Sequence, residues 1–262
     1  MKRWNGWGRD DYHYELPPNA FEYLLNTLGS GCSAADATLE DTLRTVPEPV
    51  CPDHPLVSTD PEDRLRHARG QSVPDWIAVR SGRIDTFPSG VAYPASDEDV
   101  ADLLAYARRT GTRLIPYGGG SSVVGHINPT GDQPAVSVDL TGMDRLLDLD
   151  SESWLAEIGA GASGPRIEEQ LSEQGFRLGH YPQSWEFSTL GGWIATRSSG
   201  QQSYYYGRIE DLFAGGHIET LEGALDLPPF PASPGDYHSG GGACQAAAPG
   251  GEVLWCLFPV MG

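Results

Sequence analysis

The feature that most constrains the fold is a run of three glycines, residues 118–120, placed directly after a predicted helix and strand. Ser96 and Asp99 form a capping box at the start of that helix, and the apolar residues of 100–107 recur at helical spacing. Residues 113–115 then read as a strand that runs into the glycines. The loop therefore leaves a β-sheet at a defined place, where a backbone without side chains can approach a ligand closely.

The glycine loop, PYGGGSSVVGH at residues 116–126, has the composition of a phosphate-binding loop. Its bare amides, with the hydroxyls of Ser121 and Ser122, can converge on a diphosphate. It lacks the GKS or GKT ending of an ATP-binding P-loop. The alternative interpretation is a flexible glycine turn, and composition alone leaves both open.

A second glycine segment, GAGASG at residues 159–164, matches the G-x-G-x-x-G pattern of a Rossmann nucleotide site, and Glu186 follows roughly 20 residues later. The strand before it, residues 154–158, is short and alternates instead of being apolar throughout, which is untypical of a buried parallel strand. The helix after it is brief. We therefore expect this segment not to bind a nucleotide.

Residues 180–200 form a third candidate segment, dense in polar, aromatic and glycine residues. Such a loop can wrap a flat ring system, with hydroxyl groups supplying a few placed polar contacts. The alternative is a surface loop whose aromatic side chains shield the edge of a sheet.

The remaining patterns predict an α+β fold with a mixed sheet, because short strands alternate with helices. We expect strands at 91–93, 135–140 and 154–158, and helices at 20–28 and 166–174, closed by Gly29 and Gly175. Residues 39–54 read as irregular. The predicted organisation is an N-terminal arm (1–88), a ligand-binding domain (89–230) and a poorly ordered tail (231–262) rich in glycine.

Charge and cysteine usage exclude several function classes. The net charge is −19, with 36 acidic against 17 basic residues, which disfavours nucleic acid and anionic membranes as partners. The cysteines show no metal-ligand or redox spacing, so no metal is expected; they are Cys32, Cys51, Cys244 and Cys256. No signal sequence or membrane span is recognisable. We expect a reduced, cytoplasmic protein without an integral membrane segment.

Three motifs carry a family resemblance: PYGGGSSVVGH, then GHYPQSWEFSTLGGWIATRSSG, then YYYGRIEDL. In this order they resemble the FAD domain of alkyldihydroxyacetonephosphate synthase and its bacterial relatives, in the vanillyl-alcohol-oxidase superfamily. RWNGWG at residues 3–8 and the stretch 63–82 resemble the N-terminal arm of that family. The likeness covers residues 2 to about 230.

The resemblance implies two small α+β subdomains that clasp FAD non-covalently. The residues implied at the pyrophosphate are Pro116, Tyr117, Gly118, Gly119, Gly120, Ser121 and Ser122. The residues implied along the flavin and its ribityl chain are Pro182, Gln183, Ser184, Trp185, Glu186, Phe187, Ser188, Ala195, Thr196, Arg197 and Ser198. Arg197 would offset negative charge on cofactor or substrate. We expect His126, His180 and His217 to be hydrogen-bonded structural residues.

The resemblance also implies an enzyme that uses FAD. The synthases exchange the acyl chain of acyl-dihydroxyacetone phosphate for a fatty alcohol, a lipid-derived substrate, whereas other relatives oxidise 2-hydroxy acids such as glycolate or lactate. The chain is expected to stop before the substrate-cap domain of the family, so a catalytically silent flavin domain is the rival hypothesis. Homodimer formation is left open. The third alternative is a Rossmann-type protein that binds NAD through the segment containing Gly161 and not through the loop containing Gly119.

Overall fold

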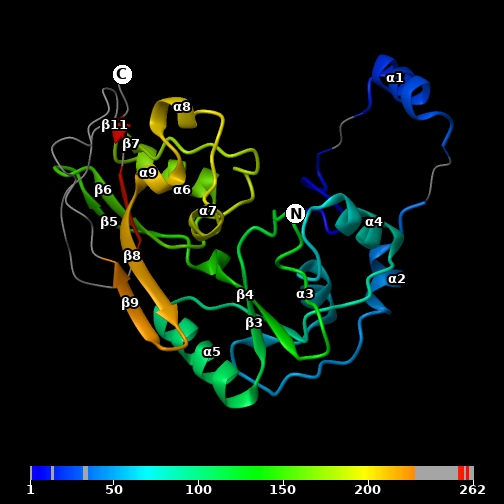
Figure 1. Ribbon diagram of the computed structural model, residues 1–262, viewed down its shortest axis with the longest axis horizontal. Helices are drawn as coiled ribbons and strands as arrows, with labels where there is room; N and C mark the ends of the chain where they lie inside the picture. Colours follow the sequence, from blue (N-terminus) through cyan, green and yellow to red (C-terminus); the bar gives the residue numbers. More distant parts are fainter. Residues whose placement is uncertain (1, 13–14, 32–34, 228–252, 257, 260–262) are drawn as a thin grey trace.

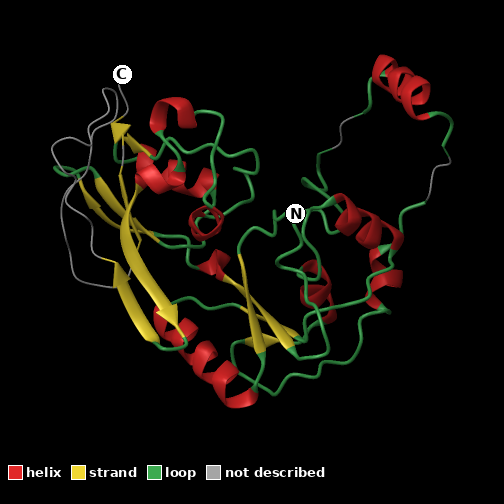
Figure 2. Cartoon of the chain, in the orientation of Figure 1, coloured by secondary structure: helices red, strands yellow, loops and turns green. Residues whose placement is uncertain are grey.

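Two β-sheets, each with its own helices, form two lobes that lie side by side in the computed structural model (Figures 1 and 2). The structure describes residues 2–12, 15–31, 35–227, 253–256 and 258–259. The predicted α+β class is confirmed. Among the described residues, no helix combines the length and the apolar character needed to cross a membrane.

The first lobe contains the predicted mixed sheet, with strand order β1-β2-β4-β3. The central strand β4 is parallel to both β2 and β3, whereas β1 is antiparallel to β2. Every residue of β4 is buried, because strands cover both of its edges and the lobe covers its faces. The strands are β1 (Val57–Ser58), β2 (Gly90–Ala92), β3 (Arg113–Tyr117) and β4 (Ala135–Asp139).

Helix α5 (Asp97–Thr110) precedes β3 and sets the direction of the chain that leads to the glycine loop. The Ser96 hydroxyl accepts from the Asp99 amide at 3.3 Å, which is half of the predicted capping box. The Asp99 carboxylate instead accepts from the amide of Ala95 at 2.8 Å. Gly111 adopts the left-handed conformation, φ 72°, that ends the helix and turns the chain into β3.

The second lobe is an antiparallel sheet with strand order β5-β6-β10-β8-β9, packed against short helices. Its strands are β5 (Leu146–Asp150), β6 (Leu155–Ile158), β8 (Phe213–Thr220), β9 (Gly223–Leu227) and β10 (Val253–Cys256), and β7 (Phe176–Arg177) pairs separately with β11 (Phe258–Pro259). Its helices are α6 (Gly164–Ser172), α7 (Leu190–Thr196), α8 (Ser203–Tyr206) and α9 (Ile209–Leu212). The short 3-10 helix η1 (Leu140–Gly142) leads from the first lobe to the second.

Strands β10 and β11 lie in the segment 231–262, where the sequence predicted no regular structure. β10 inserts between β6 and β8, so it completes the centre of the second sheet. The rest of that predicted tail lies outside the described residues.

The described part of residues 1–88, the predicted N-terminal arm, contains four helices, α1 (Pro18–Leu28), α2 (Leu39–Leu43), α3 (Pro61–Arg66) and α4 (Val73–Ser81). Helix α1 ends at Gly29 as predicted and stands away from both lobes, with no buried residue (Figure 2). Helix α2 lies where the sequence was read as irregular, so that prediction was wrong. Its Leu39 and Leu43 pack against a buried cluster that includes Leu65, and this tertiary contact stabilises a helix of low local periodicity.

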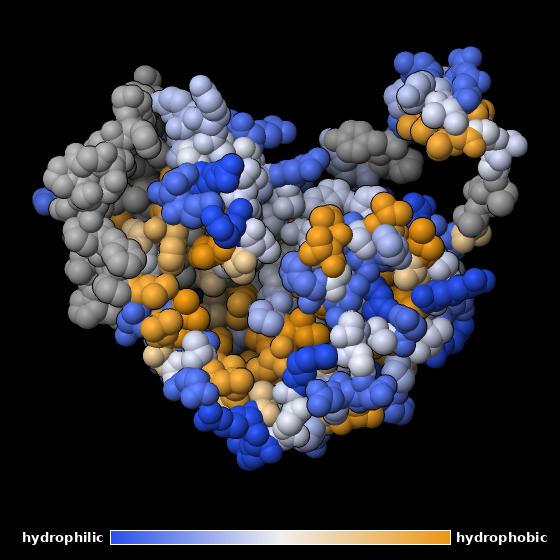
Figure 3. Space-filling view, viewed as in Figure 1, coloured by the Kyte–Doolittle hydropathy of each residue, from blue (hydrophilic) through white to orange (hydrophobic). Residues whose placement is uncertain are grey.

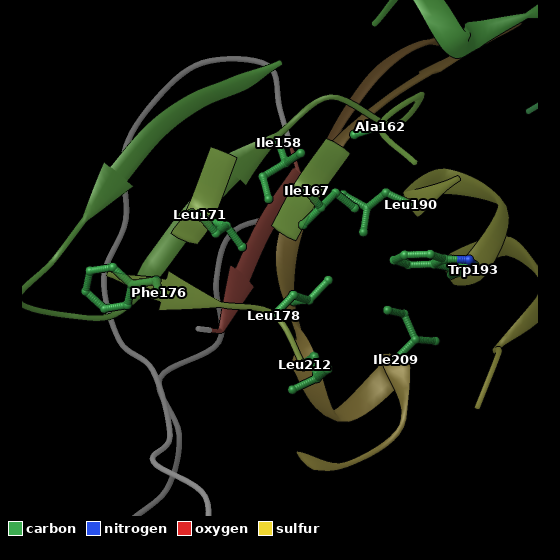
Figure 4. Close-up of a cluster of buried hydrophobic side chains, with 11 residues drawn as sticks. Ile158, Ala162, Ile167, Leu171, Phe176, Leu178, Leu190, Trp193, Ile209 and Leu212 are labelled. Carbon is green, nitrogen blue, oxygen red and sulfur yellow. The ribbon is translucent and has the colours of Figure 1, made fainter. Parts of the chain in front are cut away.

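The core of the second lobe is a cluster of aliphatic side chains and one tryptophan (Figure 4). Ile167 and Leu171 project from α6 toward Ile158 on β6, and Leu190 and Trp193 approach from α7. Because α7 is anchored in this cluster, the loops at both of its ends are held in fixed positions.

Replacing Leu171 by alanine should lower the free energy of unfolding by about 2–5 kcal/mol, because the side chain is fully buried and its loss leaves a cavity. Urea denaturation measures this change. Leu225→Ala is the matched control, since that side chain is 49% exposed and its loss should cost less than about 0.5 kcal/mol. Equal losses in the two variants would contradict the assigned core.

Candidate functional site

The glycine loop lies at the carboxyl end of β3, beside the carboxyl end of the parallel strand β4. Tyr117, the last residue of β3, pairs with Asp139, the last residue of β4. Ligands of open α/β sheets bind at such carboxyl ends. Gly120 adopts φ 65°, a left-handed conformation typical of backbone nests that hold anions.

Glycine is required at each position of the triplet because the loop packs directly against other chain segments. A methyl group on Gly118 would lie 2.1 Å from the Thr189 hydroxyl oxygen, and one on Gly119 would lie 1.5 Å from the carbonyl oxygen of Phe187. One on Gly120 would meet the Tyr117 hydroxyl at 2.0 Å. The fold thus brings the first predicted segment, residues 116–122, into contact with the second, residues 182–188.

Four consecutive amide groups of this loop, at residues 119–122, have no acceptor within the part of the chain that the structure describes. Gly119, Gly120, Ser121 and Ser122 donate no backbone hydrogen bond there, although Gly120 is buried. Two carbonyls of the same stretch, by contrast, are bonded: the Gly119 oxygen accepts from Lys2 Nζ, and the Ser122 oxygen accepts from the Gln71 amide at 2.6 Å. A buried donor without an acceptor is costly, so this arrangement suits an anionic ligand.

Ser122 differs from its predicted role in one respect. Its hydroxyl lies 3.2 Å from His126 Nδ1 and accepts from the Val124 amide at 3.4 Å, so the side chain turns toward its own loop. The backbone amide of Ser122, not the hydroxyl, is the group left for a ligand.

The second predicted segment is a series of turns fixed to α7. The Ser188 hydroxyl donates to the Ser184 carbonyl at 2.8 Å and accepts from the Trp193 indole at 2.7 Å. Trp185 Nε1 is buried and has no hydrogen-bond partner in the described chain. Pro182 is buried, whereas Gln183 and Glu186 are exposed.

The last group of predicted site residues, 195–198, lies at the carboxyl end of α7. Arg197 has φ 52°, one of two positive values found for non-glycine residues in the described chain, and such a conformation costs roughly 1 kcal/mol or more. Its guanidinium lies 3.0 Å from the carboxylate of Glu210, on the protein surface. Ala195 and Thr196 are also exposed, so all three side chains face away from the core of the lobe.

Ser198 is held by a buried histidine. Its hydroxyl lies 2.6 Å from His180 Nε2, and the imidazole packs edge-on against Trp193 with ring centroids 5.1 Å apart. Burial lowers the pKa of His180 to about 4, so the ring is neutral near pH 7. His180 therefore positions Ser198 without adding charge to the site. The other two histidines that were expected to be structural are also hydrogen-bonded: His126 to Ser122, and His217 to Asp226 and Glu219.

A cavity of about 820 Å³ lies between the lobes and is walled mainly by apolar side chains. Pro116 and Leu140 line it from the first lobe, and Ile194, Ala195 and Phe213 line it from the second. Figure 3 shows apolar surface gathered over the region between β8 and α5. Its size and apolar lining are typical of sites for small molecules and cofactors.

A second cavity, of about 480 Å³, adjoins the glycine loop itself. Gly118, Gly119 and Phe187 line it together with the basic side chains of Lys2 and Arg66. The loop therefore lies close to both cavities and to positive charge from the N-terminal arm.

The second glycine segment has a structural role. A methyl group on Gly161 would lie 1.6 Å from the Leu140 carbonyl oxygen, and one on Gly159 would lie 2.2 Å from that of Met143. These glycines let the backbone of the second lobe touch the connection from the first. The Rossmann alternative is excluded because β6 pairs antiparallel with both of its neighbours. Substitution of Gly161 would therefore disturb the fold whether or not a nucleotide binds.

Sequence reasoning missed several groups around the loop. His67 Nε2 lies 2.8 Å from the Asp139 carboxylate, and both side chains are buried. Burial acts to raise the pKa of Asp139, but hydrogen bonds from His67 and Thr141 outweigh it and hold the pKa below its ordinary value. An acidic residue at the end of a mostly apolar strand was the available signal for Asp139. Thr189 lies inside the segment 180–200 but was not among the predicted site residues, and no local pattern marked Lys2.

Comparison with known proteins agrees with this geometry. The family model described as "FAD binding domain" matches residues 88–225. Alkyldihydroxyacetonephosphate synthase of Dictyostelium discoideum is 43% identical over 63% of the chain and 27% of its own length, and that of Trypanosoma brucei brucei is 31% identical over 86% and 42%. The mitochondrial D-lactate dehydrogenase [cytochrome] of Kluyveromyces lactis is 29% identical over 47% of the chain and 21% of its own length.

A solved structure of an alkyldihydroxyacetonephosphate synthase superposes with a TM-score of 0.79 and 29% identity, over 99% of the chain and 54% of that structure. The chain spans less than half the length of each of these curated relatives and about half of the solved structure. The family match covers more than half of the chain, and it contains both glycine segments and all of the predicted site. The chain thus belongs to the FAD-binding domain family, it is similar to the alkyldihydroxyacetonephosphate synthases, and its cofactor is FAD.

Proposed function

We propose that the chain binds FAD with the diphosphate on the free amides of Gly119, Gly120, Ser121 and Ser122. The observation that carries this proposal is the loop in which these four amides lack acceptors while two neighbouring carbonyls are bonded. A diphosphate offers several oxygens to such a set of donors, and charge-assisted hydrogen bonds are stronger than neutral ones. The unmatched donor of Gly120 then becomes satisfied.

The remaining predicted residues are proposed to contact the other parts of the cofactor. Phe187 and Ser188 touch the glycine loop through the backbone, and Ala195 reaches the apolar cavity from the end of α7. The roles proposed for these residues are contacts to the ribityl chain and to the rings of the cofactor. Arg197, although paired with Glu210, is exposed and supplies positive charge at the same end of α7. The full set is Pro116, Tyr117, Gly118, Gly119, Gly120, Ser121, Ser122, Pro182, Gln183, Ser184, Trp185, Glu186, Phe187, Ser188, Ala195, Thr196, Arg197 and Ser198.

The chemistry of the bound cofactor is redox or covalent chemistry at the flavin, which the protein directs by binding and orientation. The stronger likeness to the synthases favours a lipid-derived substrate over a 2-hydroxy acid: identity is 43% and 31% to two synthases against 29% to the dehydrogenase. We therefore propose alkyl-for-acyl exchange on a dihydroxyacetone phosphate ester as the reaction class. An assay of the purified chain with both substrate classes separates these activities from a flavin domain without catalysis.

Gly119→Ala should weaken FAD binding by about 10- to 100-fold, because the new methyl group must push the loop away from Phe187 and so disturb one or more amide contacts, each worth about 1.5–3 kcal/mol to a charged group. Flavin fluorescence quenching measures the affinity. Gly31→Ala is the control, because no atom of the described residues, its chain neighbours aside, lies within 4 Å of its added methyl group. Unchanged affinity in Gly119→Ala would contradict the assignment.

A ligand series tests the diphosphate itself. FAD and ADP should both bind and compete, whereas riboflavin, which carries no phosphate, should bind at least about 100-fold more weakly than FAD, since several charged hydrogen bonds are absent. Calorimetry measures the three affinities, and the visible spectrum of the purified protein reports flavin already held. Riboflavin binding as tight as FAD binding would show that the rings, not the loop, supply the affinity.

A further inference from the structure

The N-terminal segment of residues 2–9, which we call the N-terminal hairpin, folds back on itself beside the glycine loop. Lys2 pairs with Arg9 in an antiparallel bridge, and the Arg3 amide donates to the Gly8 carbonyl at 2.9 Å. In Figure 1 the start of the chain lies in the middle of the molecule, between the two lobes. The hairpin is therefore in a position to contact both.

Contacts on two sides hold the hairpin. Arg66 Nη1 of α3 donates to the Lys2 carbonyl at 3.2 Å, and α3 contacts β2, so this bond ties the hairpin to the first lobe. The Trp7 ring meets the Phe187 ring edge to face, with centroids 5.0 Å apart and an interplanar angle of 86°, which ties it to the second. Phe187 belongs to the same loop that touches Gly119.

Within this frame the Lys2 side chain reaches the glycine loop. Its ammonium group donates to the Gly119 carbonyl, and it lies 3.2 Å from the position that a methyl group on Gly120 would take. Burial lowers the pKa of Lys2 to about 8, Asp139 opposes that shift, and Arg66 adds to it. At pH 7 the group therefore remains mostly protonated.

The peptide unit between Gly119 and Gly120 transmits this contact. A trans peptide is planar, with its carbonyl and its N–H on opposite sides, so a cation on the Gly119 carbonyl leaves the Gly120 N–H directed away from Lys2. A cation on the carbonyl also polarises the unit and strengthens its N–H as a donor. At the other end of the loop the Gln71 amide holds the Ser122 carbonyl in the same manner, but without charge.

We propose that Lys2 is a positioning residue for the cofactor diphosphate. It bonds the carbonyl side of the Gly119–Gly120 peptide, so that the Gly120 amide on the opposite side faces the anion, and its ammonium group adds positive charge near the diphosphate. This inference rests on the proposed diphosphate site. It assigns to the N-terminal hairpin a part in cofactor binding that lies outside residues 88–225, the stretch matched by the family model.

The test compares Lys2→Met, which keeps an unbranched apolar stem, with Arg3→Met as the matched control. Arg3 is the adjacent cation, and its guanidinium hydrogen bonds among the described residues go to the carbonyls of Arg9 and Tyr12 in the arm itself. At pH 7, Lys2→Met should weaken FAD and ADP binding about tenfold or more and leave riboflavin binding unchanged. Arg3→Met should bind all three ligands like the unmodified chain, and Lys2→Arg should restore much of the lost affinity.

The pH profile adds a readout that a purely structural role would not move. Lys2 is faced by Asp139 and Arg66, with Tyr117 beside it and His67 bonded to Asp139. The pKa of Tyr117 is raised by burial and that of Asp139 is lowered, so neither titrates between pH 7 and 9. ADP affinity of the unmodified chain should fall as the pH rises through about 8, where Lys2 loses its proton, and that fall should be absent in Lys2→Arg and Lys2→Met.

Hydrogen exchange of the ligand-free protein separates this proposal from the one on which it rests. Lys2→Met should speed exchange in residues 117–123, and Arg3→Met should not. An unmodified chain that binds neither FAD nor ADP would overturn the proposed function. A chain that binds them, with Lys2→Met matching it or losing FAD and riboflavin affinity in equal measure, would overturn only the role of Lys2.

Discussion

The hydrogen bonds to the carbonyl side of the glycine loop are the constraint on which the rest of the site depends. Each peptide unit of residues 119–123 has one polar group on either side, and bonding the carbonyl decides where the amide points. Lys2 and Gln71 bond two of those carbonyls from the N-terminal arm. The arm is thus bonded directly to the glycine loop, although it carries none of the groups proposed to touch the cofactor.

The local elements of the first lobe could be predicted from the sequence because their signals are local. Ser96 and Gly111 mark the two ends of α5, and the triple glycine marks the loop. Helix α2 was missed although Thr38 caps it by accepting from the Asp41 amide, because five residues show no clear periodicity. Its Leu39 and Leu43 are stabilised by contacts with residues more than 20 positions away. β10 is likewise defined by pairing with two strands far from it in sequence.

In the candidate site, too, some features could be predicted from the sequence and others could not. Motif order identified the three segments, but only the fold shows that Gly119 touches Phe187, and that the Ser122 hydroxyl turns back toward His126. A sequence pattern names residues; it does not say which of their polar groups are already bonded. Lys2 illustrates the limit most clearly, because it is separated from Gly119 by 117 positions and no motif joins them.

The glycines at the junction of the lobes have a geometric consequence. Gly119 meets the backbone at Phe187, and Gly161 meets the backbone at Leu140, so main chain rests on main chain at two separate points. The spacing of the two lobes is therefore set by backbone atoms, which every residue possesses. A different side chain at these points cannot widen or narrow the gap between the lobes without breaking a backbone contact. The size of the group that this gap accepts is therefore adjustable only through the side chains on its walls, at positions such as Ile194 and Leu140.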